Sequence, residues 1–272
     1  MKKKFPIKIV LSMAAVFFSF LFNPVLGRVV LGVFVVYMFF SNRSIFYEVF
    51  ATKAHNKGEM EKAIGLFKKA SKTTQNTRPK ITYGYLLLKA GKIDIASEVF
   101  KEMIGSNIDE DSKRKAKSNY ALVLWKDGKI DEAIELLEEV FSEYESSVIY
   151  GSLGYLYILK GDLKKALEFN KEAYDYDDAD PIILDNLGYV YYLIEDFSKS
   201  DEIYKELMKL KPQFPEAYYN YSLVLKKLDK LEDALEIIKK GNNYNVSFLS
   251  NLTKEEMKSQ LEEIEHLISK QQ

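Results

Sequence analysis

The chain has no cysteine, only two histidines and a single tryptophan among its 272 residues. Without cysteine it can form no disulfide and no thiolate metal site, and it has no cysteine nucleophile. The two histidines, His55 and His266, stand far apart in the sequence, and we do not expect them to meet. Chemistry that depends on thiols or on paired imidazoles is therefore not expected.

Acidic residues are absent from residues 1–43, which carry six basic side chains. All 40 acidic side chains therefore follow this segment, together with 33 of the 39 basic ones, and residues 44–272 have a net charge of −7. A body of this charge repels nucleic acid at long range, so we expect no nucleic-acid partner. With 47% hydrophobic residues the chain has enough apolar material to fold.

Two apolar runs fill the N-terminal segment, at residues 7–22 and 25–40, with Asn23 and Pro24 between them. As a helix, each run would be about 24 Å long, whereas the hydrocarbon core of a bilayer is about 30 Å thick. Pro24 lacks an amide donor and disfavours helix at the residue before it. Residues 1–43 are therefore predicted to form a membrane-anchor helical hairpin, transmembrane or re-entrant, that contacts lipid through residues 5–40.

The orientation of such a hairpin follows from the basic cluster Lys2-Lys3-Lys4. Both ends emerge on one side, and the positive-inside bias makes that side the cytoplasm. We therefore expect a protein of the cytoplasmic (cell) membrane with its remaining body in the cytoplasm. A cleaved secretory signal is the alternative, because it also has a basic start and an apolar stretch. Cleavage near Gly27 would still leave the apolar segment from Val29 to Phe40.

A repeat of about 34 residues runs through the rest of the chain. Each unit has a small landmark residue, a second small residue twelve positions earlier and a turn residue five positions earlier. The landmarks are Ala63, Ala96, Ala133, Ala166, Ser200 and Ala234, the earlier small residues are Ala51, Gly84, Ala121, Gly154, Gly188 and Ser222, and the turn residues are Gly58, Gly91, Gly128, Gly161, Glu195 and Asp229. This pattern predicts paired helices that approach closely, joined by a turn with a left-handed residue.

Large apolar residues stand at helical spacing between these landmarks, most fully in DNLGYVYYLIEDFSKSDEIYKELMKLKP, Asp185 to Pro212. The pattern resembles the tetratricopeptide repeat (TPR) family, whose unit has large apolar, small, aromatic and proline residues at set positions. The resemblance covers residues 44 to 245. It implies an all-α fold, with a right-handed TPR superhelix (α-solenoid) after the hairpin.

The predicted domain organisation has three parts. After the hairpin, residues 44–248 form six TPR units, and residues 249–272 form a C-terminal capping helix that opens with a capping box at Thr253 and Glu256. The second unit is longer than the others near Asn107 to Asp111, which predicts a lengthened loop. The units are residues 44–76, 77–113, 114–146, 147–180, 181–214 and 215–248.

No constellation of catalytic or metal-binding residues stands out. The acidic run from Asp175 to Asp180 lacks glycine at the sixth position of a calcium loop and has Asn186 at the twelfth, where glutamate is required. Asp180 is instead expected to cap a helix that begins at Pro181. We therefore predict no catalytic residue, no metal, no cofactor and no small-molecule substrate, and we expect that the chain is not an enzyme.

The resemblance implies a partner-binding groove, because the first helix of each TPR unit lines a concave surface in that family. Aligned on the landmarks, the groove positions hold large apolar side chains, and asparagine stands at the sixth position of three units. The predicted binding residues are Tyr85, Leu122, Trp125, Tyr155, Ile158, Tyr189, Tyr192, Tyr219, Asn119, Asn186 and Asn220. Such side chains suit an extended or helical peptide. The alternative is that the tyrosines only pack against the neighbouring unit.

The sequence thus predicts a membrane-anchored, cytoplasm-facing TPR scaffold or adaptor that binds a protein or peptide partner in an aromatic concave groove. An alternative is a subunit of a membrane protein complex, in which the hairpin and Arg28 make the specific contact and the repeats act as a spacer or protect a client. An exported TPR protein of the cell envelope is a third alternative. Acidic chaperone tails are not expected as ligands, because the groove lacks their clamp of Lys, Asn and Arg.

Overall fold

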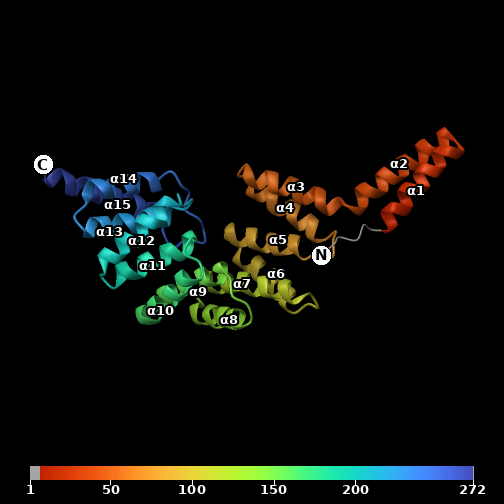
Figure 1. Ribbon diagram of the computed structural model, residues 1–272. Coiled ribbons are helices and arrows are strands. Elements are labelled where there is room, and N and C mark those ends of the chain that lie inside the picture. The colour runs from red at the N-terminus through yellow and green to blue at the C-terminus, as the bar shows by residue number, and fades with distance from the viewer. Residues whose placement is uncertain (1–6, 272) are drawn as a thin grey trace. The chain divides into compact units, whose positions relative to one another are not determined.

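The computed structural model describes residues 7–271 of the chain, and their side chains from Leu11 onward. The cluster Lys2-Lys3-Lys4 and the first two residues of the predicted lipid-contacting segment 5–40 lie outside the described residues. Within residues 7–271 every regular element is an α-helix, as predicted. The chain divides into two compact units, Met1–Tyr83 and Gly84–Gln272, whose helices are labelled in Figure 1.

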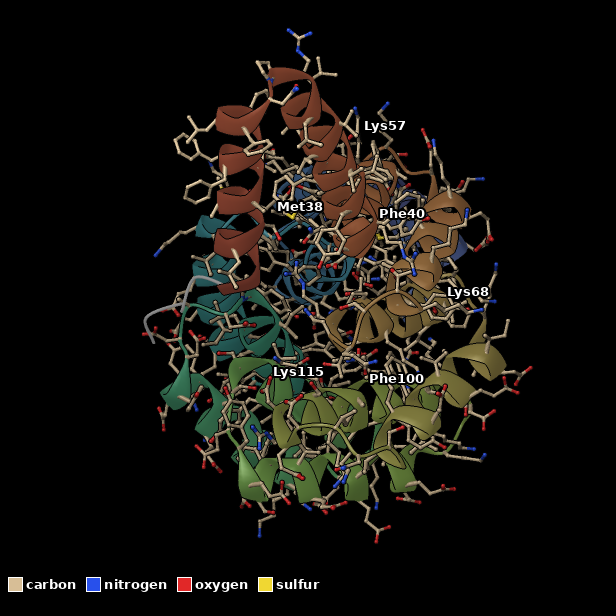
Figure 2. The ribbon with its side chains drawn as sticks, turned by 90° about the vertical axis from the view of Figure 1, so that its right-hand side faces the viewer. Met38, Phe40, Lys57, Lys68, Phe100 and Lys115 are labelled. Carbon is tan, nitrogen blue, oxygen red and sulfur yellow. The ribbon has the colours of Figure 1, made fainter. Side chains whose placement is uncertain are left out.

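The first unit begins with two apolar helices that pack against each other, α1 (Ile7–Phe22) and α2 (Pro24–Ser41). The side chain of Asn23 caps α2, because its Oδ1 accepts hydrogen bonds from the amides of Val25 at 2.8 Å and Leu26 at 3.3 Å. Pro24 occupies the first helical position, where an amide donor is not needed. Phe40 of α2, which is labelled in Figure 2, has 58% of its surface exposed.

The hairpin leads directly into the first repeat helix. Only Asn42 separates α2 from α3 (Arg43–Asn56), and the rings of Phe39 and Phe46 lie 5.0 Å apart across it. Helix α4 (Met60–Ser71) packs against α3, and α5 (Arg78–Lys89) begins in this unit. Helix α3 leaves a row of large apolar side chains exposed, namely Ile45, Phe46, Val49 and Phe50.

The second unit continues the alternation of paired helices and turns. Its helices are α6 (Ile93–Ile104), α7 (Glu110–Lys126), α8 (Ile130–Glu143), α9 (Ser147–Lys160), α10 (Leu163–Tyr176), α11 (Pro181–Leu193), α12 (Phe197–Lys209), α13 (Pro215–Lys227), α14 (Leu231–Gly241) and α15 (Lys254–Gln271). The two helices contact each other in the pairs α7–α8, α9–α10, α11–α12 and α13–α14, and the first helices α9, α11 and α13 also pack side by side.

The twelve small residues predicted to bring helices together are all buried. At Gly188, for example, the backbone carbonyl accepts a 2.7 Å hydrogen bond from the Ser200 hydroxyl of the paired helix. The six predicted turn residues all have positive φ, including Glu195 at 64° and Asp229 at 55°. The landmark pattern therefore identified both the helix contacts and the turns correctly.

The longer second repeat is accommodated differently from the prediction. The extra residues near Asn107 to Asp111 do not lengthen a loop but extend α7, which begins at Glu110. The Asp109 carboxylate accepts a 2.9 Å hydrogen bond from the amide of Ser112 and so caps the helix early.

Helix α15 closes the C-terminal end of the repeats. Thr253 and Glu256 form the predicted capping box, since the Thr253 amide donates to Glu256 Oε2 at 2.7 Å and the Glu256 amide donates to Thr253 Oγ1 at 3.1 Å. Met257 and Ile264 are buried against the core of α13 and α14.

Candidate partner-binding site

The predicted binding residues all lie on the first helix of a pair. Together they define what we call the first-helix face. Trp125, Ile158 and Asn186 are buried, with 8%, 5% and 3% of their surface exposed. The half-buried members are Tyr85 on α5, Asn119 and Leu122 on α7, Tyr155 on α9, Tyr189 and Tyr192 on α11, and Tyr219 and Asn220 on α13.

The structure brings most of the large side chains of this face into two clusters. Leu122, Tyr155 and Tyr189 pack against a core that contains Trp125 and Ile158. The rings of Trp125 and Tyr155 meet edge to face at 5.4 Å. A second core, built on α13, is contacted by Tyr192 and Tyr219, and Tyr192 stacks on Tyr189 at 6.0 Å. Tyr85 belongs to neither of these two clusters.

The tyrosine hydroxyls of the first-helix face are among those that form no hydrogen bond within the described chain, as also holds for Tyr120 and Tyr191. Those of Tyr85, Tyr155, Tyr189, Tyr192 and Tyr219 form no hydrogen bond with another described residue. By contrast, each of six other tyrosines donates its hydroxyl to a carboxylate or carbonyl oxygen within the chain, namely Tyr150, Tyr157, Tyr174, Tyr204, Tyr218 and Tyr221.

Partial burial fixes the protonation state of these hydroxyls. Burial raises the pKa of Tyr85, Tyr155, Tyr189, Tyr192 and Tyr219 above the usual value for tyrosine. They are therefore neutral at physiological pH and keep a donor proton. A row of neutral donors on partly apolar rings can bind the carbonyl groups and apolar side chains of a peptide.

The three asparagines already use their amide groups inside the chain. Asn186 donates to the Gly151 carbonyl at 2.8 Å and so ties α11 to α9, and Asn119 donates to the Lys115 carbonyl at 2.8 Å. Asn220 donates to the Asp185 carboxylate at 3.2 Å. The geometry gives Asn186 a packing role between repeats.

Two features near this face were not found from the sequence. Asp185 is a buried carboxyl group on α11, and its burial raises its pKa to about 7. The link between α14 and α15 also contacts α7, since Lys126 donates to the Ser250 carbonyl at 3.0 Å. The length of this link, from residue 242 to 253, was the available sequence signal, whereas nothing in the sequence marked Asp185 as buried.

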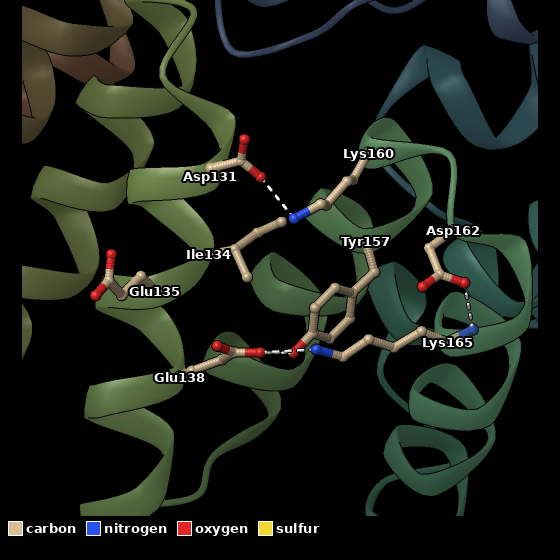
Figure 3. Close-up of a pocket in the computed structure, with 8 residues that line it drawn as sticks. All are labelled: Asp131, Ile134, Glu135, Glu138, Tyr157, Lys160, Asp162 and Lys165. Atoms are coloured by element: carbon tan, nitrogen blue, oxygen red, sulfur yellow. Dashed lines mark hydrogen bonds and ion pairs between the residues drawn. The ribbon is translucent and has the colours of Figure 1, made fainter.

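A separate hollow of about 280 Å³ lies between α8, α9 and α10 (Figure 3). Four of its six charged side chains form two ion pairs with each other. Lys165 and the Tyr157 hydroxyl both donate to Glu138, at 2.9 and 2.6 Å, and Lys160 pairs with Asp131 at 2.6 Å. These bonds join neighbouring repeats, so we interpret the hollow as a packing feature. Within the described residues no group of acidic or histidine side chains could hold a metal ion.

Comparison with known proteins identifies the class of protein that this fold and face define. One tetratricopeptide repeat model matches residues 83–148 and 121–181, and a second matches residues 183–214 and 215–245. The chain therefore belongs to the tetratricopeptide repeat family, whose repeats generally serve protein–protein interaction and not catalysis. No curated protein matches the chain.

Solved structures share the fold at low sequence identity. A tetratricopeptide repeat protein from Parabacteroides merdae has a TM-score of 0.66 at 12% identity, over 82% of this chain and 85% of its own. The APC/C hetero-tetramer Cut9–Hcn1 has a TM-score of 0.61 at 18% identity, over 72% of this chain and 39% of that chain. Pseudomonas aeruginosa pilF has a TM-score of 0.56 at 14% identity, over 72% and 89%. At these identities the likeness concerns the fold alone.

Proposed function

We propose that the chain is a membrane-anchored TPR adaptor that faces the cytoplasm and captures a protein partner on its first-helix face. The observation that carries this proposal is the row of five half-buried tyrosines without internal hydrogen-bond partners. None of these hydroxyls is among the buried polar atoms that lack a partner, so each is open to water or to a ligand that accepts its proton. The same proposal assigns residues 1–43 to the anchor, residues 44–248 to six repeats and residues 249–272 to the cap.

Removing two of these hydroxyls should weaken capture without disturbing the fold. In the full-length protein, Tyr155→Phe with Tyr189→Phe should raise the dissociation constant for the partner about thirtyfold, because each neutral hydrogen bond contributes about 1 kcal/mol. The measurement is affinity capture from detergent extract, followed by titration of the partner identified by mass spectrometry. Unchanged binding, or a large fall in melting temperature, would support the reading that these tyrosines only pack.

Tyr174→Phe is the matched control for this experiment. Its ring is also half-buried, but its hydroxyl donates to Glu206 at 3.0 Å and lies on α10, which is a second helix. We expect this substitution to leave capture unchanged.

The membrane anchor is supported by α2, which is long and apolar enough to cross a bilayer and has only 6% of its residues buried. Helix α1 is shorter and also apolar. The exposed apolar row on α3 begins directly after α2. An anchor explains why so many large apolar side chains lack protein contacts, since lipid would cover them.

Charged substitutions in α2 should release the protein from membranes. Val33 and Val36 are 65% and 55% exposed. Aspartate at both positions should move the full-length protein from the membrane pellet to the soluble fraction, because each carboxylate costs about 3 kcal/mol near the bilayer centre. Aspartate at Ser198 and Ser259, which are exposed on α12 and α15, is the control and should not move it. Retention of the α2 variant in the pellet would contradict the anchor.

The second candidate function places the specific contact in the hairpin, within a membrane protein complex. It is favoured by Arg28, an exposed cation in an otherwise apolar helix. In that case capture should survive the tyrosine substitutions and be lost with Arg28→Gln.

A further inference from the structure

The link between α14 and α15 is far longer than a change of chain direction requires. It covers residues 242–253, whereas every other link from α3 to α14 has six residues or fewer. In Figure 1 this blue loop extends from the C-terminal helices toward the green ones. The extra length therefore lets the chain reach repeats that are distant in the sequence.

The middle of this link, residues 246–250, lies against the first-helix face. Lys126 at the end of α7 donates to the Ser250 carbonyl at 3.0 Å, and its ammonium group lies 5.2 Å from the Phe248 ring. The same ammonium group lies 4.5 Å from the ring of Trp125. Leu249 packs against the core that contains Trp125. One lysine thus contacts both this segment and the predicted binding surface.

The ring of Phe248 lies next to Gly91. A Cβ atom built on Gly91 would lie 3.4 Å from the Phe248 ring. Gly91 is the left-handed turn residue between α5 and α6, and the ring rests against it. The aromatic side chain of the segment therefore packs at a defined position.

The segment is held by few contacts. Its hydrogen bond to the rest of the unit is the one from Lys126, and Phe248 remains 40% exposed. Helix α15 is attached independently, through the Gln260 bond to Ser222 at 3.3 Å and the Lys226 ion pair with Glu263 at 2.8 Å. Residues 246–250 can therefore leave the face while α15 stays in place.

We propose that residues 246–250, Val-Ser-Phe-Leu-Ser, are a resident pseudo-ligand, and that the face binds in trans an extended peptide of the same chemistry. That partner segment carries an adjacent Phe-Leu pair between small polar residues and offers a backbone carbonyl to Lys126. This inference rests on the proposed function, because it names the ligand class for the same face. The resident segment competes with the partner for the face and so raises the partner concentration that capture requires.

Competition of this kind has a measurable consequence. When a site is available for only a fraction of the time, the apparent affinity falls by that fraction. Phe248→Ala should weaken the binding of the resident segment to the first-helix face. The fold should be little affected, because the ring is partly exposed. We expect the apparent dissociation constant for a trans peptide to fall at least tenfold in this variant.

The tryptophan provides the readout without a label. Trp125 is the only tryptophan in the chain and is 8% exposed. Loss of the resident segment should shift its emission to the red and increase quenching by acrylamide. The test uses full-length protein in detergent and a synthetic peptide of residues 244–253, with alanine replacing Phe248 and Leu249 in the control peptide. Ile95→Ala, which removes a side chain that is 44% exposed on α6, is the control variant.

In Phe248→Ala we expect the Trp125 emission to shift to the red, and we expect the peptide, but not the control peptide, to reverse this shift. The peptide should bind the wild-type protein at least tenfold more weakly than it binds the variant. Equal binding to both proteins, or no binding to a folded variant, would overturn the proposal and leave the segment as a connector. If Phe248→Ala lowers the melting temperature, Leu249→Ala provides the same test within the segment and should also release it, because Leu249 packs against the core that contains Trp125.

Failure of this proposal can be told apart from failure of the proposed function. The tyrosine substitutions test capture of the natural partner and do not involve the peptide. If they abolish capture while the peptide fails to bind, the first-helix face is functional but the resident segment is not its mimic.

Discussion

Replacing Gly188 with valine is expected to lower the free energy of unfolding of the repeats by about 3 kcal/mol or more. A Cβ atom at this position would lie 2.7 Å from the ring of Tyr204. That ring is fully buried, and its hydroxyl donates to Asp185 at 3.0 Å, so it has no room to move. Thermal unfolding by circular dichroism should show a melting temperature about 6–12 °C lower.

Gly65→Ala is the matched control for this prediction. Gly65 also lies within a helix, α4, but nothing stands within 4 Å of a Cβ atom built there. Alanine at an open helical position should stabilise by about 0.5–1 kcal/mol, because glycine loses more conformational freedom on folding. The two substitutions should therefore change the stability in opposite directions. A Gly188→Val protein with the same melting temperature as the wild type would contradict the close packing of α11 and α12.

The stability of the repeats should rise as the pH falls from 8 to 5, and Asp185 should be the main cause. Burial raises the pKa of Asp185 from its usual value near 3.8 to about 7, against hydrogen bonds from Asn220 and Tyr204 that lower it. The nearby carboxyl group of Glu216 raises it further. Asp185 forms no ion pair with any described residue.

The direction of this pH dependence follows from the difference between the pKa of Asp185 in the folded state and in the unfolded state. The folded state holds the Asp185 proton more tightly than the unfolded state, so the charged form is destabilising when folded. This cost is complete above pH 7 and disappears as the pH falls toward 4, with a slope of at most about 1.4 kcal/mol per pH unit. Asp185→Asn should remove this slope and exceed the wild type in stability at pH 8, measured by denaturant unfolding across the pH range.

Asp201 is a control with the opposite sign. Burial alone would raise its pKa, but hydrogen bonds from Lys205, Lys230 and Tyr221 lower it below the usual value. Its contribution to stability is therefore present at neutral pH and is lost in acid. Asp201→Asn should destabilise the protein at pH 8. If Asp185→Asn instead kept the wild-type pH profile, the buried carboxyl group would not be the titrating one.

The repeat itself could be predicted from the sequence because its constraints are local. Small residues such as Gly188 and turn residues such as Gly161 are required by backbone geometry wherever two helices meet or reverse. Even Glu195 and Asp229, which are unusual at positive φ, were identified because they occupy the turn position of a regular unit. The family comparison and the fold confirm this part of the prediction.

The candidate site was less predictable, because it depends on contacts between residues distant in the sequence. The first-helix positions could be counted from the landmarks, but whether a side chain there is buried depends on its neighbours. Asn186 shows this, since its amide group reaches the backbone of Gly151 on another repeat. The contact of Lys126 with Ser250 joins residues 124 positions apart, and no local pattern encodes it.

The single residue between α2 and α3 limits how far the first repeat can move relative to the hairpin. A disordered tether would let the repeat sweep a volume around its anchor, whereas Asn42 alone spans at most about 3.6 Å. In the proposed anchored protein, helix α3 therefore stays close to the hairpin and at a nearly constant distance from the membrane. A partner of the first repeat must then approach to that distance. Inserting residues at position 42 would lengthen the linker and let the repeat reach partners farther from the membrane.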